Sequence, residues 1–296
     1  MSLLDNTTPM RLHENNEMDA GLLHVSFITD SNEKITGNLR YPSGYDYSSH
    51  IPALLVVHGA NNAAGKFGSH EQFFLESVPH SGIAVMNIEL FGHGAKGFPE
   101  NKFGNQILDD GSEQQRIEYH SRNIDIIINS VRALKMMRGI DANNVFVMGL
   151  SLGACYAYTV GSLIPDELKC QFLLGRFGVF DEFKVKYNNK LLGISEITKN
   201  TKLPTCAIVC SEYKDKPDHE IMPELDGSNK LIYRLTEREH LPSPSGIVEL
   251  MEKDFTKDSD AKIAVRIVVS TIRKFTQPRI YNQNTFWNVH GYYQNI

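Results

Sequence analysis

The sequence predicts an α/β fold with a mostly parallel sheet of about eight strands and helices on both faces. Short, uninterrupted apolar runs recur along the chain, and such runs are typical of strands that are buried on both faces. Between them, apolar residues recur at three- and four-residue spacing, which indicates amphipathic helices. Strands that alternate with helices favour a parallel sheet with right-handed crossovers.

The first two strands are expected at residues 22–29 and 34–41, because both segments are strand-like and the polar stretch Asp30-Ser31-Asn32-Glu33 between them is typical of a hairpin turn. The apolar runs that predict buried central strands lie at residues 53–57, 83–88, 145–148, 172–174, 207–210 and 231–235.

Helical spacing is clearest in two segments, and these helices are expected to cover the sheet. The apolar positions are Ile124, Ile127, Ile128, Val131 and Leu134 in the first helix and Val265, Val268, Val269, Ile272 and Phe275 in the second.

Two connections between these elements are long. Residues 91–121 are rich in glycine and predict a loop at the sheet edge. Residues 177–202 have a partly helical pattern and are too few to form a large lid over the site.

Such a sheet uses nearly the whole chain, so residues 22–276 are predicted to form one domain. Residues 1–21 are polar and are expected to be an irregular lead-in. The tail, residues 277–296, is rich in aromatic side chains and is expected to pack on the body or on a partner subunit. The second arrangement would make the protein a homo-oligomer.

Composition excludes several classes of function. With 41% hydrophobic and 22% charged residues the chain is an ordinary globular protein. Its net charge is −5 and it has no basic block, which argues against nucleic acid as a partner. The N-terminus lacks a basic region followed by an apolar run, and no stretch reaches the roughly 18 apolar residues of a membrane span. We therefore expect a soluble, cytoplasmic protein.

The four cysteines, at positions 155, 170, 206 and 210, lie in or beside predicted strands and helices rather than in loops. This placement predicts buried thiols and not a disulfide framework. No cysteine and histidine cluster has the spacing of a zinc site, so no metal is expected.

The stretch VFVMGLSLGA, residues 145–154, places a serine between an apolar strand and a helix start, within a Gly-x-Ser-x-Gly pattern. A serine in such a turn is strained and exposes its hydroxyl, and the flanking glycines avoid collisions that a Cβ would cause. The five-residue pattern is common by chance, but its flanking strand and helix are those that the chemistry requires. We therefore predict that Ser151 is a nucleophile.

A serine hydroxyl needs a base to remove its proton, and the base needs a carboxylate to orient it. Both are expected after later strands, where a parallel sheet places its site. His240 follows the strand at 231–235 and is the predicted base. Asp215 follows the strand at 207–210 and is the predicted acid, with Glu212 and Asp218 as alternatives because the register of this loop is open.

The oxyanion formed by nucleophilic attack needs hydrogen-bond donors. The backbone N–H groups of Leu152, next to the nucleophile, and of Ala60, after the strand at 53–57, are the predicted donors. His58 is expected to brace this loop rather than to act in catalysis.

Two side chains are candidates for substrate binding. Asn61 lies in the same loop as Ala60, and Arg176 follows the strand at 172–174. Arg176 could bind a substrate carboxylate, although arginines are more often paired with a nearby acid, here Asp181.

With these residues in place, the chain resembles the α/β-hydrolases over about residues 22–276. The resemblance rests on the His58-Gly59 loop, the turn Phe91-Gly92-His93-Gly94, the serine elbow, and the late acid and histidine. The opening hairpin and the stretch at 139–144 are similar to the dienelactone-hydrolase, acetyl-esterase and prolyl-oligopeptidase-like branch.

The chain also departs from that pattern. Glu89 stands where members usually have Asp, and Ser211 stands where many have Gly. Dienelactone hydrolases use cysteine as the nucleophile, so their specific activity is not implied by a serine at this position.

The resemblance implies hydrolysis of a carboxylic ester of a small or medium acyl group, through an acyl-enzyme intermediate and without a metal or organic cofactor. The partner would be a small-molecule acyl ester. A thioesterase, an acyltransferase or a peptidase would use the same residues, and a non-catalytic binding module would keep the fold without turnover.

Overall fold

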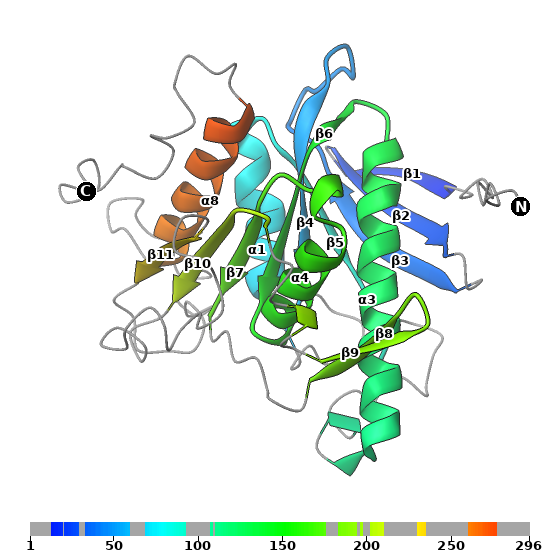
Figure 1. Ribbon diagram of the computed structural model, residues 1–296. Helices are drawn as coiled ribbons and strands as arrows, with labels where there is room; N and C mark the ends of the chain where they lie inside the picture. Colours follow the sequence, from blue (N-terminus) through cyan, green and yellow to red (C-terminus); the bar gives the residue numbers. More distant parts are fainter. Residues whose placement is uncertain are drawn as a thin grey trace, which may run out of the picture.

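The computed structural model describes eleven segments of the chain, which together contain one nine-stranded sheet and a separate two-stranded sheet (Figure 1). The order in the large sheet is β1-β2-β3-β5-β4-β6-β7-β10-β11. The strands from β5 to β11 in this order are parallel, and β1, β2 and β3 form an antiparallel extension at one edge. The described residues are 13–19, 21–29, 33–59, 69–92, 107–108, 110–175, 183–193, 196–197, 202–209, 230–234 and 260–276.

The strands are β1 (His13–Asp19), β2 (Leu22–Ile28), β3 (Lys34–Arg40), β4 (Ile51–Val57), β5 (Ala84–Ile88), β6 (Ile140–Leu150), β7 (Gln171–Leu174), β8 (Lys184–Tyr187), β9 (Lys190–Gly193), β10 (Thr205–Val209) and β11 (Lys230–Arg234). The helices are α1 (Ser69–Ser77), α3 (Glu113–Met136), α4 (Leu152–Leu163) and α8 (Asp260–Thr276), with short 3₁₀ turns η1 (Val78–Ser81) and η3 (Pro165–Glu167).

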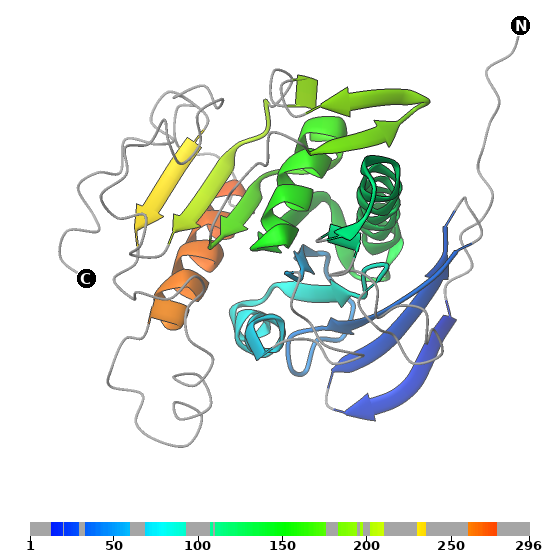
Figure 2. The same ribbon diagram turned by 90° about the horizontal axis from the view of Figure 1, so that it is seen from below.

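The sheet separates two hydrophobic cores, which explains why its central strands are apolar throughout. Along β4, Leu55 and Val57 face the core beneath α3 and α4, whereas Leu54 and Val56 face the core beneath α1 and α8. All four side chains are fully buried. Figures 1 and 2 show the two helical layers on opposite faces of the sheet. The predicted α/β architecture, with helices on both faces of a mostly parallel sheet, is confirmed.

Each predicted strand is present with ends shifted by a few residues, and both predicted helices are present as α3 and α8. The sheet has one strand more than predicted because β1 lies within the segment expected to be an irregular lead-in, residues 1–21. β1 pairs antiparallel with β2 and forms the edge of the sheet. Its polar sequence HENNEMD suits an edge strand, and lacks the apolar alternation that would have predicted it.

Helix α3 begins earlier than predicted, inside the region expected to be a loop at residues 91–121. A capping box starts it: the Ser112 hydroxyl accepts from the Gln115 backbone N–H, and the Gln115 side chain accepts from the Ser112 backbone N–H. The first turns then bury Ile117 and Tyr119, so these turns are held by tertiary packing as well as by the cap.

The segment predicted to be partly helical, residues 177–202, contains the hairpin β8–β9, which was not predicted, and is helical at residues 196–197. Asn188 and Asn189 form its turn with φ of 48° and 61°, and asparagine tolerates this left-handed region better than most residues. Val185 is fully buried, and the Lys186 backbone N–H donates to the Ser121 hydroxyl of α3 at 2.7 Å. The hairpin therefore lies against α3, as Figure 2 shows. The predicted tail, residues 277–296, lies outside the described residues.

Candidate active site

Ser151 lies between β6 and α4 with a backbone conformation that non-glycine residues rarely adopt, φ 53° and ψ −117°. The strain is held by two backbone hydrogen bonds. The Ser151 N–H donates to the Leu174 carbonyl of β7 at 2.9 Å, and its carbonyl accepts from the Ala154 N–H at 2.8 Å. The residue is half-buried between two buried leucines. This is the turn that the Gly-x-Ser-x-Gly pattern predicted.

The two glycines of the pattern are required by close approach of the backbone. A Cβ on Gly149 would lie 1.9 Å from the Gly153 carbonyl oxygen. A Cβ on Gly153 would lie 2.4 Å from the Val57 carbonyl oxygen at the end of β4. Strand β6, helix α4 and strand β4 therefore meet at the turn with no room for a side chain at either position.

A third glycine brings the loop after β4 against the serine. A Cβ on Gly59 would lie 3.1 Å from the Leu150 carbonyl oxygen and 3.2 Å from the Ser151 Cβ. The loop that was expected to supply an oxyanion donor thus begins in contact with Ser151. Ala60 and Asn61, the next residues in it, lie outside the described residues.

His58 is buried and links the ends of two neighbouring strands. Its Nδ1 donates to the Gly59 carbonyl at 2.8 Å, because a carbonyl can only accept, and its Nε2 accepts from the Leu90 N–H at 3.2 Å. With one ring nitrogen donating and the other accepting, the imidazole is neutral. Burial lowers its pKa below the ordinary histidine value, against opposing effects of the Gly59 hydrogen bond and two nearby glutamates. These contacts agree with the bracing role expected from the sequence.

Glu89 is hydrogen-bonded to β3. It stands at the position where the resemblance to α/β-hydrolases leads one to expect aspartate. Its carboxylate accepts from the Thr36 hydroxyl at 2.6 Å, and its backbone N–H donates to the Thr36 carbonyl at 3.0 Å. The longer side chain thus secures the turn after β5 to the antiparallel part of the sheet.

Leu152 is the first residue of α4, and its side chain is buried in the core. A backbone N–H at this position has no partner within the helix, and the helix dipole favours negative charge there. The location is therefore chemically suited to an oxyanion donor, and this role of Leu152 stays a prediction.

The remaining predicted site residues follow strands that the structure does describe. β10 and β11 are parallel neighbours that end together, with Val209 paired to Arg234, and β7 lies between β10 and β6 in the sheet. The carboxyl ends of β10 and β11 therefore lie at the same edge of the sheet as the carboxyl end of β6. Asp215, Glu212, Asp218, His240 and Arg176 themselves lie outside the described residues, so their roles stay predictions.

A buried polar cluster between α3 and α4 was not predicted. The His120 Nδ1 lies 3.0 Å from the Tyr156 hydroxyl. The ring of Phe183, the residue before β8, packs on His120 with 4.7 Å between the two ring centroids. Burial, with a smaller effect of the Arg116 charge, lowers the pKa of His120 to about 4. Histidine among apolar helix positions gives no pattern in the sequence, and the facing Tyr156 hydroxyl provides its buried ring with a hydrogen-bond partner.

The described cysteines, Cys155, Cys170 and Cys206, are buried thiols, as predicted, whereas Cys210 lies outside the described residues. Cys155 is close to the elbow in sequence, but burial raises its pKa to about 12. A thiol that stays protonated is a poor nucleophile, so Cys155 does not replace the cysteine that dienelactone hydrolases carry.

The described segments contain no arrangement of three or more His, Cys, Asp or Glu side chains that could bind a metal ion. In those segments we also find no helix with the length and apolar character that crossing a membrane requires.

No protein-family model matches the chain, and no curated protein matches it in sequence. Solved structures do match. A dienelactone hydrolase from Anabaena variabilis aligns with a TM-score of 0.59 at 14% identity, over 90% of this chain and 99% of that one. An acetyl xylan esterase from Paenibacillus sp. R4 aligns with a TM-score of 0.55 at 14% identity, over 82% of this chain and 86% of that one. An esterase domain from Rhodothermus marinus aligns with a TM-score of 0.54 at 13% identity, over 86% of this chain and 98% of that one.

Substitution of Gly149 by alanine should destabilise the protein more than the same change at a glycine with open space. Gly149→Ala would force a Cβ against the Gly153 carbonyl, and we expect a loss of about 3 kcal/mol or more in the free energy of unfolding. Gly82→Ala is the control, since its φ is +82° but no atom lies within 4 Å of the added Cβ; this strain costs about 1–2 kcal/mol. Urea unfolding of the two variants measures both values, and equal losses would contradict the close approach.

The buried His120 should make stability depend on pH. Its pKa in the folded protein is about 4 and its ordinary value is 6.5, so between these values the unfolded chain binds a proton that the folded protein excludes. The free energy of unfolding therefore falls as pH falls through this window, and the effect is complete below about pH 4. His120→Gln keeps a hydrogen-bonding group but cannot titrate. When the pH is lowered from 7 to 4.5, the free energy of unfolding of the wild type, measured with a denaturant, should fall by about 2 kcal/mol more than that of this variant. Identical losses in the two proteins would refute a neutral His120.

Proposed function

From its α/β-hydrolase fold, which holds Ser151 in a strained turn at the carboxyl end of β6, we propose that this chain is a serine hydrolase acting on carboxylic esters of small or medium acyl groups. The observation that carries the proposal is the Ser151 conformation. Backbone strain of this kind persists only when surrounding contacts impose it, and it clusters at functional sites. Here three glycines and two hydrogen bonds impose it.

The proposed reaction begins when His240 removes the proton of the Ser151 hydroxyl and the oxygen attacks the acyl carbonyl. The backbone N–H groups of Leu152 and Ala60 stabilise the oxyanion. His240 then protonates the departing alcohol, leaving an acyl-enzyme on Ser151. Water, deprotonated by the same histidine, attacks the acyl carbonyl; the bond to Ser151 then breaks, the carboxylic acid leaves, and His240 returns the proton to the Ser151 oxygen. Asp215 orients His240, and no step requires a metal or an organic cofactor.

The bracing of the loop after β4 supports this scheme. His58 holds the Gly59 carbonyl, and Gly59 lies against Ser151. An oxyanion donor must be fixed before the reaction because reorganisation would cost part of the stabilisation it provides. A buried neutral imidazole with both nitrogens engaged is a rigid support for such a loop.

The first substrates to test are acetyl esters. Proteins of similar fold include acetyl xylan esterases, which suggests a short acyl group as the starting point. A panel of p-nitrophenyl esters of increasing chain length, together with matching thioesters, would separate an esterase from a thioesterase on the same residues.

Ser151 should react with a fluorophosphonate probe. We expect labelling of the wild type at Ser151, shown by peptide mapping, and none in Ser151→Ala or His240→Ala. Ester turnover in Ser151→Ala should fall by about 10⁶-fold, with an unchanged thermal midpoint because the hydroxyl contributes little to packing. Ser162→Ala is the control: Ser162 lies on the same helix, its hydroxyl donates to the Tyr158 carbonyl at 2.9 Å, and labelling should persist. A folded wild type that is not labelled would argue for a non-catalytic binding module.

Amide substitution should identify the acid. We expect Asp215→Asn to lower kcat by about 10⁴-fold, as loss of the orienting carboxylate does in other serine triads. Glu212→Gln and Asp218→Asn are matched controls from the same loop and should stay within a few-fold of wild type. A harmless Asp215→Asn together with an inactive Asp218→Asn or Glu212→Gln would move the assignment to that residue.

A further inference from the structure

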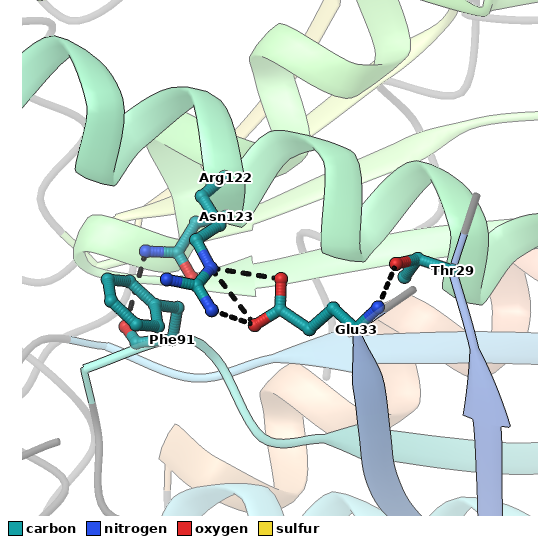
Figure 3. Close-up of polar contacts among 5 residues, drawn as sticks. All are labelled: Thr29, Glu33, Phe91, Arg122 and Asn123. Carbon is teal, nitrogen blue, oxygen red and sulfur yellow. Dashed lines mark hydrogen bonds and ion pairs between the residues drawn. The ribbon is translucent and has the colours of Figure 1, made fainter. Parts of the chain in front are cut away.

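Arg122 on α3 lies at a junction of three elements that are distant in sequence (Figure 3). Its Nε is 3.0 and 2.9 Å from the two carboxylate oxygens of Glu33, and one terminal nitrogen is 2.8 Å from the first of them. The centre of its guanidinium also lies 3.6 Å above the ring of Phe91. One side chain therefore joins the hairpin β2–β3 to the turn after β5.

The carboxylate that holds Arg122 is itself fixed. The Glu33 backbone N–H donates to the Thr29 hydroxyl at 3.0 Å, and its carbonyl accepts from the Thr29 N–H at 2.9 Å. The Glu33 side chain is 20% exposed. A two-point contact between a planar guanidinium and an anchored carboxylate fixes the orientation of the arginine as well as its position.

Phe91 is held through its backbone as well as through its ring. The fully buried Asn123, next to Arg122 on α3, donates its side-chain N–H to the Phe91 carbonyl at 3.4 Å. The preceding residue, Leu90, donates its N–H to His58. Figure 3 shows Arg122 and Asn123 approaching Phe91 together from the helix.

These contacts lead step by step to Ser151. β5, β4 and β6 are adjacent in the sheet, so the turn after β5 lies about 10 Å from the turn after β6. Between them lies the loop after β4, which His58 ties to Leu90 and which contacts Ser151 at Gly59. A shift of Phe91 would displace Leu90, and through His58 the loop that faces the nucleophile.

We propose that Arg122, held by Glu33, is a positioning residue for the reaction at Ser151. It fixes the turn at Phe91 and, through Leu90 and His58, the geometry of the loop beside the nucleophile. This inference rests on the proposed serine-hydrolase function. An exposed ion pair alone contributes little to stability, so the effect expected here is on catalytic rate and not on folding.

The test compares the Arg122–Glu33 ion pair with a control pair, Arg132–Glu167, whose arginine also lies on α3. Arg132 is as exposed as Arg122, at 42%, and its Nε and terminal nitrogen lie 3.2 and 3.0 Å from a carboxylate oxygen of Glu167. Glu167 belongs to η3, which follows the C-terminal end of α4, away from Ser151. The variants are Arg122→Lys and Glu33→Gln, with Arg132→Lys and Glu167→Gln as controls.

Lysine keeps the charge of Arg122 but has neither the fork nor the flat face that lies on Phe91. We expect kcat for the best p-nitrophenyl ester to fall about tenfold in Arg122→Lys and Glu33→Gln, because a displacement of a fraction of an ångström in a catalytic loop is enough for such a loss. KM should stay within about twofold. The rate of fluorophosphonate labelling should fall with kcat, and the double variant should lose no more than either single variant. The control pair should retain wild-type kcat, and all variants should share similar thermal midpoints.

Three results would overturn the inference. Wild-type kcat in both Arg122→Lys and Glu33→Gln, with Ser151 active, would reject the positioning role and leave the proposed function intact. An equal loss in the Arg132 and Glu167 variants would show a general effect of helix α3 rather than a role for Arg122. Absence of both turnover and labelling in the wild type would reject the proposed function, and this inference with it.

Discussion

The arrangement around Ser151 depends on the close approach of three backbones. Strand β6 ends, α4 begins and β4 ends within contact of one another, and Gly149 and Gly153 leave no space for a Cβ between them. Ser151 must therefore turn through a left-handed conformation, and it can do so because β7 accepts its N–H at the Leu174 carbonyl. Such strain costs of order 1–3 kcal/mol. The two cores on either side of β4 and β6 offset it, since the strands that converge on the turn are buried on both faces.

The same requirement for a fixed backbone explains the polar groups around the turn. His58 is buried where a charged imidazole would be costly, so it stays neutral and uses both nitrogens to join Gly59 to Leu90. Glu89 binds Thr36 on β3 and so anchors the turn after β5 from the other side. Each polar group satisfies a backbone or side-chain partner across a strand boundary. The ends of β4 and β5 are thereby fixed relative to each other.

Much of this could be predicted from sequence because burial on both faces leaves an apolar run, and the elbow leaves a spaced pair of glycines. The positions of β4, β6 and Ser151, and the supporting role of His58, followed from those patterns. Other elements depend on contacts between distant residues. Ser112 and Gln115 cap α3 inside a glycine-rich segment, and Asn188 and Asn189 form the β8–β9 turn inside a segment whose apolar pattern is partly helical, so periodicity predicted neither the start of α3 nor the hairpin. The pairing of Glu33 with Arg122, 89 residues apart, leaves no local pattern at all. The acid that would orient His240 is a similar case, because several carboxylates follow β10 in the sequence and the path of the loop selects one of them.

Helix α3 does more than cover the sheet. Its 24 residues extend about 36 Å, and Figure 1 shows the helix continuing past the sheet at the end where it begins. There it lies beside the hairpin β8–β9 (Figure 1). Phe183, which precedes β8, packs its ring against those of His120 on α3 and Tyr156 on α4. A hydrogen bond buried between two helices penalises rotation or sliding of one against the other, because either movement would leave a polar group unpaired. Since α4 begins directly after Ser151, this contact restrains the turn that carries the proposed nucleophile, while Arg122 and Asn123 contact the neighbouring turn at Phe91 from the same helix.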